Sequence, residues 1–357
     1  MTDFDRLDVV MPAFNEGEHV SDAARHLREA GQRANLATRL IVVDDGSNAP
    51  SAQVLDRMAA DGEIVLLRQA NSGRFVARAR GLAASETDYV LLLDARVNLD
   101  AKALVELRRR VAQGRGEVWN LHVRLANVSS LAAAFWSGLV KVWWRDYWRN
   151  PRPVTIDGEN FDRFPKGTGA FFAPRSLLAS AMDGFTSSFD NPKLVSDDTG
   201  LLRALAEDPG IHLDPAVGAD YFGKEGVQKW IKQCFYRGTT FVDSYLGASG
   251  RGKLGTMFAG LSLGVIGGAY CLWRKPFATL GTVFLGSLSA GAVVKACGGN
   301  SREAQAVGLL AAPFGVVFGG GLLRGLAIAW RGKLREDRIL GGEKTYRDGG
   351  DFDGIDQ

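Results

Sequence analysis

Val42-Val43-Asp44-Asp45-Gly46-Ser47 joins a short apolar run to two adjacent carboxylates and a glycine turn. A second stretch, Leu91-Leu92-Leu93-Asp94-Ala95-Arg96, places a single carboxylate after a similar apolar run. In both stretches the acidic residues follow what we expect to be a buried strand. Ligands of open α/β sheets bind at the carboxyl ends of the strands, so both stretches are candidate binding loops.

Strand and helix patterns alternate around these stretches. Apolar runs predict strands at 8–12, 40–43, 64–67, 89–93 and 117–125, and helical spacing predicts helices at 18–30, 51–60, 74–84 and 101–113. This alternation predicts an α/β fold with a doubly wound, mostly parallel sheet. The net charge of the 357-residue chain is only +3, with scattered basic residues, so nucleic acid is not an expected partner.

The composition becomes apolar after about residue 250. Three apolar stretches, 254–273, 276–296 and 304–330, are each long enough to cross a hydrocarbon core of about 30 Å. We therefore expect a soluble domain at 1–250, a transmembrane region of about three spans at 251–335, and a disordered polar tail at 336–357. Basic residues flank both ends of this region, and basic flanks favour the cytoplasmic side of a membrane. Three spans, however, would place the two ends on opposite sides. Either the third stretch is a re-entrant pair broken near Pro313 and the glycines at 319–321, or charge is a poor guide to topology.

Residues 132–149 interleave aromatic and basic side chains, such as Trp136, Lys141 and Trp143. This pattern suits a helix that lies in a membrane interface, and the alternative is an aromatic core helix. The N-terminus is polar and predicts no signal peptide. We therefore expect a multi-pass protein of the cell membrane whose N-terminal domain is cytoplasmic.

The ordered series of motifs resembles the family 2 inverting glycosyltransferases. The resemblance covers roughly residues 7 to 240 and is carried by Val10-Met11-Pro12-Ala13-Phe14-Asn15-Glu16, Val43-Asp44-Asp45-Gly46-Ser47, Asn71-Ser72-Gly73 with Ala77-Arg78, and Leu93-Asp94-Ala95. It implies the nucleotide-sugar-binding α/β fold called GT-A. The nucleotide-sugar-binding residues would be Pro12, Ala13, Asn15, Glu16, Asp44, Asp45, Asn71, Gly73, Arg78, Asp94, Arg96 and Arg237.

Simple chemistry supports several of these roles. The loop at Pro12 and Ala13 can lie against a flat base, and Asp45 can accept a hydrogen bond from one. The alternative is that the acids at 44–45 cap a helix. Arg74, Arg78 and Arg80 can neutralise a diphosphate, although at least one of them is expected on a solvated helix face.

Asp94 matches the first acid of the family's Asp-x-Asp motif, which helps to bind Mg²⁺ or Mn²⁺, and Arg96 stands in place of the second. A guanidinium cannot ligate a cation but can bind phosphate oxygens. Three interpretations stay open. Arg96 replaces the metal, so that catalysis is metal-independent; or Asp94 holds a metal loosely with Asp100 or another carboxylate; or the site is inactive.

On the acceptor side, Gly167, Thr168 and Gly169 resemble the family's small-residue segment under the donor sugar. Asp197 and Asp198 resemble its pair of acids at the start of a helix, in which the second, Asp198, is the general base. A helix cap at Ser196 with two acids in the first turn is the alternative. Residues 233–238 resemble, imperfectly, a Gln-x-x-Arg-Trp element, in which Gln233 would contact the acceptor and Arg237 the leaving diphosphate.

The leading hypothesis is an inverting glycosyltransferase that moves a sugar from a nucleotide-diphosphate donor to a lipid-linked or cell-envelope glycan acceptor. One alternative is sugar transfer directly to polyprenyl phosphate. A second is a non-catalytic, nucleotide-sugar-binding subunit of a glycan-synthesis complex.

Overall fold

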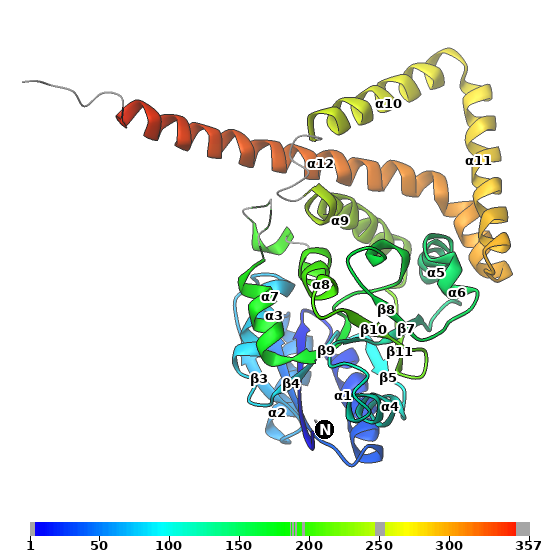
Figure 1. Ribbon diagram of the computed structural model, residues 1–357. Helices are drawn as coiled ribbons and strands as arrows, with labels where there is room; N and C mark the ends of the chain where they lie inside the picture. The colour runs from blue at the N-terminus through cyan, green and yellow to red at the C-terminus, as the bar shows by residue number, and fades with distance from the viewer. Residues whose placement is uncertain are drawn as a thin grey trace, which may run out of the picture.

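The computed structural model describes residues 4–185, 187, 189, 191–194, 197–246 and 254–347. An α/β domain forms one end of the molecule, and three C-terminal helices lie over one side of it (Figure 1). The predicted boundary near residue 250 falls in the stretch 247–253, outside the described residues.

An eight-stranded sheet is the centre of the domain, in the order β3-β2-β1-β4-β9-β6-β10-β8. Its strands are β1 (Arg6–Ala13), β2 (Ala37–Asp44), β3 (Val65–Arg68), β4 (Tyr89–Leu93), β6 (Trp119–Asn120), β8 (Val154–Ile156), β9 (Ala170–Pro174) and β10 (Ile211–Leu213). The first four strands pair in parallel, which confirms the prediction there. The second half is mixed, because β9 runs antiparallel to β4 and β6, and β8 to β10.

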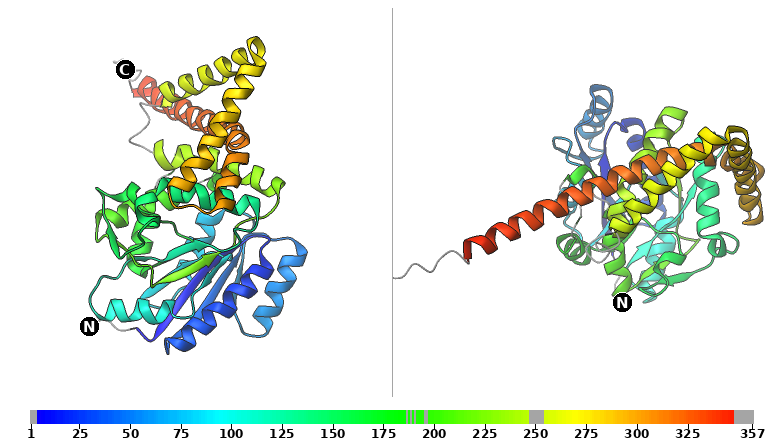
Figure 2. Two further views of the ribbon diagram at one scale, coloured as in Figure 1. Left: turned by 90° about the vertical axis from the view of Figure 1, so that its right-hand side faces the viewer. Right: turned by 90° about the horizontal axis from the view of Figure 1, so that it is seen from above.

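Helices cover both faces of this sheet (Figure 2). They are α1 (Gly17–Arg33), α2 (Ala49–Ala60), α3 (Arg74–Ala83), α4 (Ala103–Ala112), α7 (Arg175–Asp183) and α8 (Asp197–Glu207). Side chains alternate along the strands, so Val9 and Leu91 join one hydrophobic core while Val10 and Leu92 join the other. This two-sided burial is why the strands appear in the sequence as continuous apolar runs. The predicted doubly wound α/β fold is confirmed.

A small second sheet lies beside the first, with the strand order β5-β11-β7. Its strands are β5 (Val97–Leu99), β11 (Gly218–Tyr221) and β7 (His122–Leu125). The single strand predicted at 117–125 is therefore two strands, β6 and β7, which belong to different sheets. Because β5 directly follows the loop after β4, the small sheet brings residues near 221 to the same edge as Asp94 and Arg96.

The predicted interfacial segment 132–149 forms α5 (Leu131–Trp143) and the short α6 (Arg145–Trp148). Phe135 is fully buried and contacts the rings of Trp230 and Phe314. Trp230 belongs to α9 (Val227–Leu246), which crosses the top of the α/β domain in Figure 1. The first half of α5 is thus the aromatic core helix given as the alternative, while Trp143 at its end is 64% exposed.

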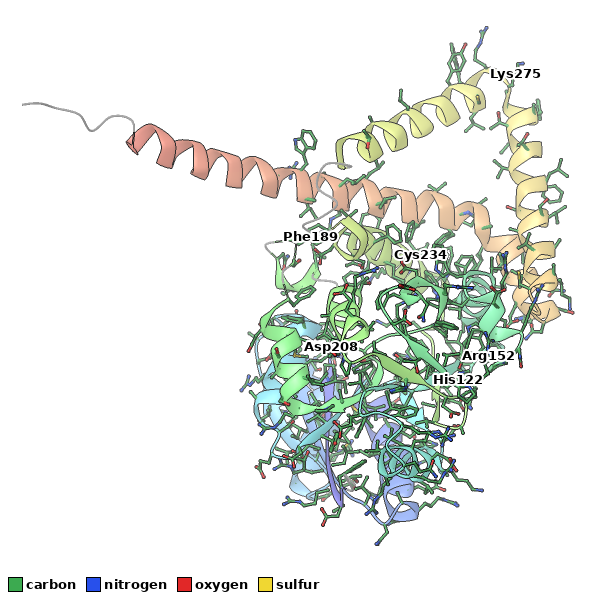
Figure 3. All side chains as sticks on the ribbon, in the orientation of Figure 1. His122, Arg152, Phe189, Asp208, Cys234 and Lys275 are labelled. Carbon is green, nitrogen blue, oxygen red and sulfur yellow. The ribbon has the colours of Figure 1, made fainter. Side chains whose placement is uncertain are left out.

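Three apolar helices follow: α10 (Leu254–Arg274), α11 (Pro276–Ala296) and α12 (Ser301–Arg347). Among the described residues, two helical segments are long and apolar enough to cross a membrane, Pro276–Ala296 and Ser301–Arg331. The first predicted span forms α10, and several of its side chains lie outside the described part. Figure 3 shows Lys275 at the corner between α10 and α11, far from the α/β domain.

Two expectations for the last apolar stretch differ from the structure. The helix α12 continues through Pro313 and the glycines at 319–321, so no re-entrant pair forms. It also continues to Arg347, so residues 336–347 are helical rather than part of a disordered tail. Good helix formers such as Leu334, Arg335 and Glu336 support this extension. The rest of the predicted tail, 348–357, lies outside the described residues.

Glycines bring α12 and α9 into backbone contact. A Cβ atom at Gly238 or Gly321 would lie 2.2 Å from a carbonyl oxygen of the other helix, and one at Gly325 would lie 2.3 Å from the Thr239 carbonyl oxygen. Such distances exclude any side chain, so these glycines allow the two helices to pack closely. Seen from above, α12 lies across the domain and extends beyond it (Figure 2).

A buried carboxylate fixes the start of α12. Glu303, 1% exposed, accepts hydrogen bonds from the Ser137 hydroxyl at 2.6 Å and from the Lys141 ammonium at 2.8 Å, both on α5. It also accepts from the Asn300 backbone N–H, while the Asn300 side chain accepts from the Glu303 N–H. This reciprocal pair is a capping box, so one side chain both begins the helix and attaches it to the domain.

We expect Glu303→Ala to lower the free energy of unfolding by about 3–5 kcal/mol, because the substitution leaves the Lys141 ammonium without its buried partner. Thermal unfolding of the detergent-solubilised protein measures this loss. The exposed pair of Glu29 and Arg33, 2.9 Å apart, is the control, and Glu29→Ala should cost about 0.5 kcal/mol or less. Equal losses in the two variants would contradict the anchoring role.

Candidate functional site

The loops after β1 and β2 are tied together by hydrogen bonds. Asn15, which has a positive φ of 57°, donates its backbone N–H to the Ser47 hydroxyl and accepts from the Asn48 N–H. The Asp45 N–H donates to the Ala13 carbonyl oxygen at 2.8 Å. The predicted base-binding segments at 12–16 and 44–47 therefore lie side by side at the carboxyl edge of the sheet.

The Asp45 carboxylate connects a third loop to these two. Its oxygens accept from the Gln69 side chain at 2.8 Å, the Ser72 N–H at 2.7 Å and the Gly73 N–H at 2.9 Å. The structure thus gives Asp45 a loop-positioning role that the sequence did not predict. Its predicted contact with a base stays a prediction.

The helix-cap alternative for the acids at 44–45 does not match the structure. The N-cap of α2 is Asn48, whose side chain accepts from the Ser51 N–H. Asp44 instead accepts from the Ser47 N–H inside the loop and lies 3.4 Å from Arg68. Both acids therefore organise the turn that follows β2.

Asp94 lies between two arginines of α3. The fully buried Arg78 donates to one carboxylate oxygen at 2.7 Å, and Arg74 lies 3.8 Å from the other. Arg80 points elsewhere and donates to the Arg68 carbonyl oxygen. Gly169 adjoins Asp94 so closely that a Cβ there would lie 3.1 Å from a carboxylate oxygen.

Arg96 forms an ion pair with Glu16 that the sequence reasoning missed. Its guanidinium donates to one Glu16 oxygen at 2.9 Å and lies 2.7 Å from the other. The two side chains are 14% and 16% exposed, so the pair is largely shielded from solvent. Both residues were predicted to bind the nucleotide sugar, and the structure shows that they also bind each other.

More cations surround these two carboxylates. Burial raises the pKa of Tyr221, and the charges of Arg237, Asp94, Arg96 and Arg74 act on its hydroxyl as well. Burial also lowers the pKa of Lys224, and Glu16, Arg96 and Arg74 act on its ammonium. In the described part of the chain, Arg74, Arg78 and Arg96 contact Asp94 or Glu16, and the charges of Lys224 and Arg237 act on Glu16 or on the neighbouring Tyr221. This excess of positive charge suits a multiply charged anion.

The carboxylates considered for a divalent cation are each bound by an arginine. One Asp94 oxygen accepts from Arg78, and Glu16 is bound by Arg96. Asp100, the other acid considered for a metal, is bound by Arg124 at 2.6 Å. Among the described residues, no group of three or more His, Cys, Asp or Glu side chains is arranged to hold a metal.

Of the predicted acceptor segments, residues 167–169 lie beside Asp94. The Gly169 carbonyl oxygen accepts from the Asp94 N–H at 2.8 Å, the Gly167 N–H donates to the Asn120 side chain, and Thr168 is buried. Gln233 and Arg237 lie one turn apart on α9, with Arg237 over the Trp136 ring at 4.3 Å. Asp197 and Asp198 begin α8, but their side chains and Ser196 lie outside the described part.

Tyr221 had no signal in the sequence, because it is one tyrosine in a short strand without a motif. Only the small sheet, which pairs Tyr221 with Val97, brings it to the edge that holds Arg96. A cavity of about 380 Å³ is lined by Asp22, Asn98, Asp100 and Asp220 among others. Of the residues considered for the site, it contains only Asp100, the acid weighed as a second metal ligand.

Comparison with known proteins supports this placement of the site. The family model described as "Glycosyl transferase family 2" matches residues 8–118, which contain β1 to β4 and the Asp44, Asp45, Asp94 and Arg96 positions.

Several curated relatives are named "Undecaprenyl-phosphate 4-deoxy-4-formamido-L-arabinose transferase". The protein of Pseudomonas paraeruginosa is 31% identical over 113 residues, which are 31% of this chain and 33% of that one. The protein of Pectobacterium atrosepticum is 30% identical over 115 residues, which are 31% and 35% of the two chains. The chain thus matches about a third of the length of these relatives.

Among solved structures, the chain is similar to S. aureus TarS 1–349 in complex with UDP-GlcNAc. The TM-score is 0.47 at 12% identity, with 98% of this chain and 95% of that chain covered. The matching family model and the arrangement of its motif residues lead to one conclusion. Residues 8–118 of this chain form a glycosyl transferase family 2 domain.

Proposed function

We propose that the protein is an inverting glycosyltransferase that moves a sugar from a nucleotide-diphosphate donor to a lipid-linked or cell-envelope glycan acceptor at a membrane. The observation that carries this proposal is the cluster of cations around Asp94 and Glu16, two residues of a family 2 domain in a chain that also has two apolar helices. Direct transfer to polyprenyl phosphate is the second candidate, and it is favoured by the printed name of the undecaprenyl-phosphate relatives.

The cation cluster supports a donor diphosphate held by protein charges alone. Arginine binds phosphate oxygens through two parallel hydrogen bonds, and Lys224 adds a point charge. Mg²⁺ is usually held by one or two carboxylates together with substrate phosphates and waters. Here Asp94 and Glu16 are each already bound by an arginine, which leaves them poor ligands for a second cation. We therefore propose that donor binding needs no divalent metal.

Metal removal tests this proposal directly. We expect the affinity for nucleoside diphosphates, measured by calorimetry with a panel of bases, to change by less than about twofold in excess EDTA. Replacing both charges of the pair, with Glu16→Gln and Arg96→Gln together, should weaken binding about tenfold, because one charge-assisted contact is lost without leaving a bare carboxylate. Arg80→Gln, on the outer side of α3, is the control. Binding that disappears in EDTA would reject the proposal.

A pH titration tests Lys224. Above about pH 8 a phosphate is already fully ionised, since its second pKa is about 6. Burial lowers the pKa of Lys224 from 10.5, so its ammonium loses its proton before an exposed lysine would. We expect nucleoside diphosphate affinity to fall as the pH rises toward 10.5, and to fall less in Lys224→Arg, which stays charged. The same slope in both proteins would show that another group titrates.

Asp198 is the proposed general base for an acceptor hydroxyl. We expect Asp198→Asn to slow sugar transfer by about 10²–10⁴-fold, because the hydroxyl keeps its proton during the attack on the anomeric carbon. The assay combines solubilised protein, radiolabelled sugar nucleotides and a membrane lipid extract. Glu207→Gln, at the other end of the same helix, is the control.

The same assay separates the candidates. An acceptor that is already an anion needs no base, so activity that survives Asp198→Asn favours transfer to polyprenyl phosphate. Nucleotide binding without transfer to any acceptor favours the non-catalytic subunit of a glycan-synthesis complex. We propose a multi-pass protein with its α/β domain in the cytoplasm, and the two apolar segments support the membrane part of that proposal.

A further inference from the structure

A groove of about 550 Å³ lies between α9 and α12. Its walls are mostly apolar, with Ile231 and Phe235 from α9 and Val316 and Val317 from α12. Gly320 leaves room between them, since a Cβ there would contact only the Phe235 ring, at 3.7 Å.

The α12 wall belongs to a segment that can lie in a membrane. Val316 and Gly320 fall within Ser301–Arg331, and Val316 is 77% exposed. On the α9 wall, Ile231 is 42% exposed. Exposed apolar side chains on both walls fit an apolar chain better than a polar ligand.

Two cations also line this apolar groove. Lys232 comes from α9, and Arg324 comes from α12, where it lies over the Phe235 ring at 5.8 Å. Among the described residues, neither forms an ion pair. A charge within a membrane segment is costly and typical of a functional site, so an anion is the complementary ligand.

One wall of the groove also contacts the acceptor side of the candidate site. The Tyr236 hydroxyl, which lines the groove, donates to the Lys193 carbonyl oxygen at 3.1 Å. Lys193 lies in the short turn η2 (Pro192–Leu194), a few residues before Asp197 and Asp198 begin α8. A headgroup in the groove would therefore lie close to the segment that carries the proposed base.

We propose that this groove binds a polyprenyl phosphate, with the prenyl chain between α9 and α12 and the phosphate on Lys232 and Arg324. The inference rests on the second candidate of the proposed function, direct transfer to polyprenyl phosphate, and sharpens it by assigning a binding site to that anionic isoprenoid lipid. It also assigns residues of α12, outside the family 2 domain, to acceptor recognition.

Binding of radiolabelled farnesyl phosphate to the full chain in detergent tests the groove. Gly320→Leu fills it, whereas Gly319→Leu is the matched control, because a Cβ at Gly319 meets nothing within 4 Å. We expect about tenfold weaker binding in Gly320→Leu and no change in Gly319→Leu. Equal effects of the two substitutions would overturn the proposal.

A second experiment tests the two cations of the groove, with Arg274 as the control. Arg274 lies over the Trp273 ring at the same 5.8 Å, but on α10 and away from the groove. Arg324→Gln combined with Lys232→Gln should weaken farnesyl phosphate binding about tenfold and remove its advantage over farnesol, because a charge-assisted contact is lost. Arg274→Gln should change neither. Equal competition by farnesol, inorganic phosphate or phosphatidylglycerol vesicles in the unaltered protein would overturn the assignment.

Nucleoside diphosphate binding and sugar transfer are measured on the same variants. Nucleotide affinity should stay unchanged in all of them. If the variants change farnesyl phosphate binding as expected but no sugar transfer occurs, the lipid site is supported and the proposed transferase activity is rejected. Sugar transfer to another acceptor, with no difference between the leucine variants, would keep the activity and reject the groove.

Discussion

The candidate site depends on the Asp45 carboxylate more than on any other group. By accepting hydrogen bonds from Gln69, Ser72 and Gly73, it holds the loop after β3 against the loop after β2. That loop ends where α3 begins, so the same bonds decide where Arg74 and Arg78 lie. The chain between Gly46 and Gly73 could not come so close with ordinary side chains, since a Cβ at Gly46 would lie 2.9 Å from the Asn71 nitrogen. One buried acid thus sets the position of the arginines that surround Asp94.

The sequence predicted the first half of the domain well because its signals are local. Continuous apolar runs identify strands buried on both faces. The bounds predicted for β4 match the structure, and those of β1, β2 and β3 differ by one to three residues at each end. The strands after residue 118 are two to five residues long, and their pairing depends on segments far apart in the sequence. The division of 117–125 between two sheets could not be predicted for that reason.

The ion pair of the candidate site also joins residues that are distant in the sequence. Arg96 and Glu16 are 80 residues apart, so the anomaly at Arg96 was visible but its partner was not. The glycines at 319–321 suggested a break in the sequence. In the structure Gly321 serves close packing against α9, and a glycine has the same local signal in either role. Which role it takes is decided by the neighbouring helix.

In the Glu16–Arg96 pair, the Glu16 carboxylate occupies the guanidinium that we propose binds the negatively charged substrate. In the proposed reaction an incoming diphosphate competes with a tethered carboxylate for the same guanidinium, so the affinity for nucleotide is a difference between two favourable interactions. The exchange also runs in reverse. When the sugar has left, Glu16 is positioned to take Arg96 back from the product, which favours release of a diphosphate that so many cations would otherwise retain.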